Sequence, residues 1–69
     1  MEYERLYTEY KSAIETQKDV IESYLKKMKN AKKSADFKEI SRLSGILKIL
    51  YTEKGELEQL ADKLRDYIT

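Results

Sequence analysis

Two runs of heptad spacing constrain this chain more than any other feature of its sequence. Nine residues in the first half recur at alternating intervals of four and three, and nine in the second half recur at intervals of three and four. This period places one stripe of side chains along a helix and does not fit the two-residue period of a strand. We call the eighteen residues the seam. They are Tyr3, Tyr7, Tyr10, Ile14, Gln17, Ile21, Tyr24, Met28 and Ala31, then Ile40, Leu43, Leu47, Leu50, Lys54, Leu57, Ala61, Leu64 and Ile68.

The break between the two runs predicts where the chain turns back. Asp36 with Glu39 three residues later fits a helix-capping box, and the chain contains no Pro. The predicted fold class is all-α, an antiparallel two-helix coiled-coil hairpin. Because 69 residues bury only a thin core, we expect two copies to dimerise into a four-helix bundle. The expected single domain, residues 1–69, has a first helix at about 2–33, a turn at about 34–36 and a second helix at about 37–68.

The register of the hairpin follows from the sequence, because residues paired across an antiparallel hairpin have numbers with a constant sum. A sum of 71 centres the turn between Ala35 and Asp36 and sets Tyr10 opposite the small Ala61. It also brings the two polar seam residues, Gln17 and Lys54, into one layer. We interpret this layer as a device that fixes register and oligomeric state rather than as a ligand site.

The two flanks beside the seam differ in character. On the charged flank, Glu4 faces Arg65 and Lys11 faces Glu58. The other flank is mostly apolar and would expose a stripe roughly 40 Å long at about 1.5 Å rise per residue. We therefore predict that a second copy of the chain, or another helical protein, binds there. We call this surface the apolar flank and define it as Leu6, Ala13, Val20, Ile46, Leu60 and Tyr67, with Ile49 beside it.

Lysines crowd the predicted turn. Residues 26–38 carry six bases and one acid, whereas residues 1–25 have a net charge of −3 and residues 39–69 of −1. One interpretation is a grip on phosphates of RNA, DNA or lipid. We favour the other, in which lysines complement the dipole of the first helix and keep the turn in water, because no nucleic-acid motif accompanies them. The lysine tip is Lys26, Lys27, Lys29, Lys32, Lys33 and Lys38; the candidate anion contacts are Lys26, Lys29, Lys32, Lys33, Lys38 and Arg42.

The residues that the chain lacks exclude most catalytic chemistry. With no Cys and no His there is no disulfide, no zinc-finger or zinc-hydrolase site, and no Cys–His or Ser–His nucleophile pair. We expect no enzyme activity, no cofactor, no metal and no small-molecule substrate. No uncharged run approaches the length of a signal peptide or a membrane span, so we expect a cytoplasmic protein without a membrane partner.

The function that these features favour is a small non-catalytic protein–protein interaction module, a dimeric adaptor or regulator. The alternative is a nucleic-acid-binding protein that uses residues 26–42. In architecture the expected hairpin resembles small helical hairpins that dimerise into four-helix bundles, among them plasmid regulators that organise RNA and short secreted hairpins with a Trp-x-Gly turn. The turn here is Ser34-Ala35-Asp36 and there is no Trp, so the resemblance assigns no residue roles.

Overall fold

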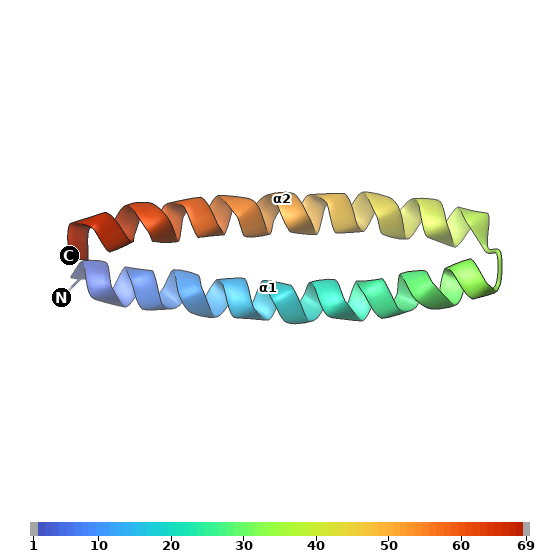
Figure 1. Cartoon of the computed structure of the whole chain (residues 1–69), viewed down its shortest axis with the longest axis horizontal. Coiled ribbons are helices and arrows are strands. Elements are labelled where there is room, and N and C mark those ends of the chain that lie inside the picture. The colour runs from blue at the N-terminus through green and yellow to red at the C-terminus, as the bar shows by residue number, and fades with distance from the viewer. Residues whose placement is uncertain (1, 69) are drawn as a thin grey trace.

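The computed structural model describes residues 2–68 as two helices joined by a tight turn. Helix α1 spans Glu2–Lys33 and helix α2 spans Phe37–Ile68. Figure 1 shows the two helices side by side along their whole length, with the turn at one end and both termini at the other. The molecule measures 50 × 15 × 13 Å, and a helix of this length at about 1.5 Å per residue accounts for its long dimension. The predicted helical hairpin is confirmed, and both helices occupy the expected residues.

The seam forms the core of the hairpin. Each of its side chains is buried or half-buried except Tyr3, which is 52% exposed. Leu43 is the most deeply enclosed, with an exposed fraction of 0%. The main buried cluster lies in the half of the hairpin nearer the turn, where both members of four expected layers pack together. Its residues are Ile21, Met28, Ala31, Leu43 and Leu47, with Tyr24, Ile40 and Leu50 packed against them.

The core is thinner toward the open end, where the two termini lie. Ile14 and Ala61 are the buried residues of this half. Farther out, the Tyr3 ring stacks on the Tyr67 ring, with centroids 5.4 Å apart and planes 17° from parallel. Tyr67 belongs to the apolar flank, so this aromatic contact ties the last seam layer to that flank.

Helix α1 ends in a Schellman motif. The amide of Asp36 donates to the Ala31 carbonyl at 3.0 Å, and the amide of Ala35 donates to the Lys32 carbonyl at 3.1 Å. Ala35 has a φ of 53°, the left-handed conformation that this motif requires and that glycine adopts most easily. The last carbonyls of α1 thus find donors although an alanine stands where glycine is usual.

Helix α2 begins on the same residue that completes this motif. The Asp36 carboxylate accepts a hydrogen bond from the Glu39 amide at 3.2 Å, and the Asp36 carbonyl accepts one from the Ile40 amide at 2.9 Å. Asp36 is therefore the N-cap of α2, as its position in the sequence predicts. The return half of the capping box does not form, because the Glu39 carboxylate binds Arg42 instead.

Three positions carry a residue that suits the backbone poorly, and each offers a stabilising substitution. A Cβ at Gly45 or Gly55 would meet nothing within 4 Å, so neither glycine serves a close approach within the chain. We expect Gly45→Ala and Gly55→Ala each to raise the free energy of unfolding by about 0.5–1 kcal/mol. We expect Ala35→Gly to raise it by about 1 kcal/mol, since glycine removes the left-handed strain. Thermal unfolding followed by circular dichroism measures all three.

The sequence leaves open whether the two helical glycines admit another helix or are simply tolerated. Alanine at Gly45 or Gly55 would then separate the alternatives. A lower melting temperature, or loss of self-association, would show that a second chain packs directly on that glycine.

Candidate interaction surfaces

The apolar flank runs along one side of both helices. Leu6, Ala13, Val20 and Ile46 are half-buried within the single chain. The remaining three members are exposed and all belong to α2: Ile49 is 61% exposed, Leu60 43% and Tyr67 72%. Within a single hairpin, the α1 residues of this flank are therefore partly covered. Three large side chains of α2 remain exposed to solvent.

A second group of exposed apolar side chains was missed by the sequence analysis. Leu25 is 43% exposed, Tyr51 51% and Phe37 77%. These residues share the heptad position of Lys11 and Glu58 on the charged flank, but they lie nearer the turn. Following that heptad position beyond its charged layers would have found them. Near the turn, the charged flank thus also carries large apolar side chains.

Two ion pairs on or beside the charged flank lie along α2. Glu58 accepts from Lys54, and Arg65 lies 3.6 Å from Asp62. A shallow hollow of about 110 Å³ opens beside them, over the small Ala61 side chain. It is smaller than the pockets of roughly 300–1,000 Å³ that hold small molecules in proteins. Its lining residues are Tyr7, Lys11, Ile14, Glu58, Ala61, Asp62 and Arg65.

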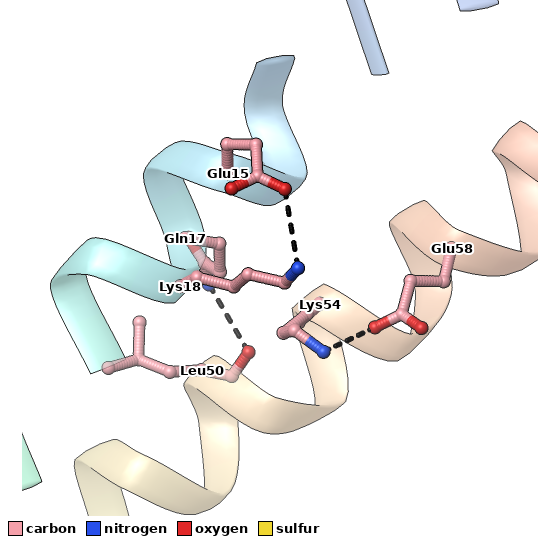
Figure 2. Close-up of polar contacts among 6 residues, drawn as sticks. All are labelled: Glu15, Gln17, Lys18, Leu50, Lys54 and Glu58. Carbon is pink, nitrogen blue, oxygen red and sulfur yellow. Dashed lines mark hydrogen bonds and ion pairs between the residues drawn. The ribbon is translucent and has the colours of Figure 1, made fainter. Parts of the chain in front are cut away.

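The two polar seam residues find separate partners. The Gln17 amide nitrogen donates to the Leu50 carbonyl across the hairpin at 3.2 Å, and the Lys54 ammonium donates to the Glu58 carboxylate one turn along α2 (Figure 2). The Lys54 side chain is 23% exposed, so its stem lies in the seam while its charge reaches the wet edge. Among residues 2–68, no buried side-chain nitrogen or oxygen lacks a partner. The Gln17 nitrogen and the Lys54 ammonium are therefore both satisfied within the chain.

Two ion pairs shift the titration of exposed carboxyls. The hydrogen bond from Lys54, and then its charge, lower the pKa of Glu58 below 4.5, and the hydrogen bond from Arg42 lowers the pKa of Glu39 in the same way. A carboxyl whose pKa is lower in the folded chain than in the unfolded chain stabilises the fold at pH values above the unfolded pKa. That contribution is lost as the pH falls through the folded value. Because both groups are exposed, salt screens these pairs and their effect on stability is small.

The lysine tip is open to solvent. All six of its lysines are exposed, and no ion pair within residues 2–68 includes any of them. The Lys27 ammonium lies 4.8 Å from the centre of the Tyr24 ring. Arg42 differs from the lysines, because its guanidinium is bound to Glu39. Of the predicted anion contacts, the five lysines therefore keep their charge available and Arg42 shares its charge with a carboxylate.

Three further findings concern the kind of site that the chain could hold. Within residues 2–68, no group of three or more acidic side chains is placed to hold a metal ion. In the same stretch, neither helix is long and apolar enough to cross a membrane. Comparisons with protein-family models, with curated proteins and with solved structures found no match to this chain.

Proposed function

We propose that this chain is a non-catalytic protein–protein interaction module, a dimeric adaptor or regulator. Two coiled-coil hairpins associate through their apolar flanks into a four-helix bundle. The observation that carries the proposal is the exposure of Ile49, Leu60 and Tyr67 on one side of α2, next to the half-buried flank residues. Such a line of large apolar side chains in water is typical of an interface.

The energy of burying these side chains supports association. Each large apolar side chain contributes roughly 1.5–3 kcal/mol when it is fully buried. A two-fold interface uses the same patch on both copies, so the three exposed residues count twice. The sum exceeds the lower estimates of the entropic cost of association, about 4–15 kcal/mol. A dimer is therefore within reach if the flanks pack well.

The apolar flank is a better interface than the group of Leu25, Phe37 and Tyr51. Residues of the apolar flank come from both helices and recur along almost their whole length. On the opposite side, Lys18 and Lys32 share the heptad position of Leu25 and interrupt the apolar group. By contrast, the charged residues at the heptad position of Leu60, Lys27 and Glu53, are opposite in sign. Lys32 has no carboxylate partner within residues 2–68, so burying its ammonium group would remove an unpaired charge from water.

Light scattering at micromolar concentration tests the proposal. We expect wild type to have about twice the chain mass of 8.2 kDa. Ile49→Lys with Leu60→Glu should give a monomer, because both side chains are exposed in the hairpin and would be buried as charges in the dimer. The matched control is Leu25→Glu with Tyr51→Lys, which makes the same kind of change on the other flank and should leave the mass unchanged.

The outcomes separate the alternatives. A well-folded wild-type monomer across this range would refute self-association and leave the flank as the docking face for a different helical protein. A control variant that dissociates while the flank variant remains dimeric would place the interface on the opposite side.

Nucleic-acid binding through residues 26–42 is the second candidate. The observation in its favour is that the lysines of the tip are exposed and have no carboxylate partner within residues 2–68. We expect generic RNA and DNA to bind no tighter than about 10⁻⁴–10⁻⁶ M at physiological salt, the range of non-specific contact. Sequence-selective nanomolar binding, weakening steeply as salt is added, would rank this function first.

A further inference from the structure

Charge is divided along the length of the hairpin. The half nearer the turn, residues 19–52, carries eight Lys and Arg and four Asp and Glu, a net charge of +4. The open-end half, residues 2–18 and 53–68, carries six Lys and Arg and nine Asp and Glu, a net charge of −3. The turn and the termini lie at opposite ends of a molecule 50 Å long (Figure 1). Each hairpin is therefore a long electric dipole.

This division distinguishes the two ways of pairing two hairpins. Resting on the dimer proposed above, we propose that the second copy lies head to tail, with its turn beside the open end of the first. A head-to-head pair would set +4 beside +4 and −3 beside −3, whereas a head-to-tail pair sets each positive half beside a negative one. Packed helices are about 8–10 Å apart, comparable to the Debye length of about 10 Å at 0.1 M salt. Charges on adjoining hairpins therefore act on each other in ordinary buffers.

The middle of the apolar flank permits this order. At about 1.5 Å per residue, Ile46 lies roughly 15 Å from the turn, and Leu60 and Ala13 lie roughly 35 Å from it. Reversing a hairpin 50 Å long exchanges these two levels. Ile46 of one copy then lies level with Ala13 and Leu60 of the other, so that apolar residues meet apolar ones.

Charged residues within and beside the apolar flank also match. Lys27 lies roughly 12 Å from the turn and Glu9 roughly 39 Å from it, by the same rise per residue. Head-to-tail pairing brings Lys27 of one copy level with Glu9 of the other. Head-to-head pairing would bring Lys27 of one copy level with Lys27 of the other, and these like charges repel.

Distances between spin labels test the order directly. The chain has no Cys, so Ser34→Cys at the turn and Arg5→Cys near the open end each provide one labelling site. Both residues are exposed. In a head-to-tail dimer, two labels at position 34 should lie about the molecular length of 50 Å apart. A mixture of chains labelled at 34 and chains labelled at 5 should add a short distance, below about 25 Å for hairpins in side-by-side contact.

Other results would overturn the order. Two labels at position 34 within about 20 Å of each other would show a head-to-head dimer, in which adjoining helices are about 8–10 Å apart. A separation far beyond the 50 Å length would show hairpins that overlap only at their open ends. Light scattering on the same labelled samples distinguishes these outcomes from failure of the proposed dimer, since a monomer mass refutes both proposals.

Charge variants provide a second test, because they should change the affinity of the dimer in opposite directions for the two orders. Lys26→Gln, Lys29→Gln, Lys32→Gln and Lys33→Gln together should weaken a head-to-tail dimer by about tenfold at low salt. The same change would strengthen a head-to-head dimer, because it removes repulsion. The matched control is Lys11→Gln with Lys63→Gln, two exposed lysines of the acidic half. Their loss should tighten the head-to-tail dimer. Tighter association of the tip variant would overturn the proposal.

Discussion

Leu43→Ala should remove most of the stability of the hairpin. Leu43 has an exposed fraction of 0% and packs in the main buried cluster with Ile21, Met28 and Leu47. Truncating a leucine in such a site costs about 2–5 kcal/mol, from the lost burial and the cavity left behind. A chain of this size has a total stability of only about 3–10 kcal/mol. Urea unfolding followed by circular dichroism at fixed protein concentration should show a midpoint near zero denaturant.

Leu25→Ala is the matched control for this variant. It deletes the same atoms from a side chain that is already 43% exposed and lies outside the cluster. We expect a loss below about 1 kcal/mol, as for most surface changes. Equal losses from the two substitutions would mean that the cluster around Leu43 does not dominate the folding energy.

Gln17→Leu combined with Lys54→Leu should raise the melting temperature. Gln17 contributes one hydrogen bond to the Leu50 carbonyl, and Lys54 contributes an ion pair with the half-exposed Glu58. Two leucines would instead continue the apolar seam, and each should contribute roughly 1.5–3 kcal/mol if it is well buried. A hydrogen bond of the Gln17 kind is worth only about 0.5–1.5 kcal/mol, so the balance favours the double variant.

The same variant should have a less uniform oligomeric state. A polar residue in a heptad seam selects one register and one number of helices at a cost in stability, and the all-apolar seam loses that selection. Sedimentation velocity should resolve more than one species. A control with Ser12→Leu, at an exposed site outside the seam, should change neither property. A lower melting temperature with unchanged association would show that the Gln17 and Lys54 contacts stabilise the fold.

The fold followed from the sequence because its signals are local and periodic. Heptad spacing alone predicts which stripe of each helix is buried, and the Asp36 cap predicts where the second helix begins. The partners of Gln17 and Lys54 could not be predicted in this way. Long polar side chains reach several acceptors within one helical turn, and the heptad position does not decide between a carbonyl across the hairpin and a carboxylate along the same helix.

The exposed apolar surfaces were predictable only in part. Heptad position assigns Leu6, Val20 and Leu60 to one flank, but all three share that position while the first two are half-buried and the third is exposed. Burial at this edge of the seam depends on how the two helices cross, which the spacing does not specify. Leu25 and Tyr51 were predictable in principle, because their heptad position is visible in the sequence.

Asp36 ends one helix and begins the next, and this sharing limits how the chain can change in length. One residue inserted in the turn would separate the end of α1 from the N-cap of α2, which now share Asp36. One residue inserted inside either helix would rotate the segment beyond it by about 100° and shift it by about 1.5 Å, which would move its seam residues off the core. Only whole heptads added to both helices at matching levels keep the seam and the turn together. The hairpin can therefore lengthen or shorten only in steps of seven residues, made in both helices at the same level.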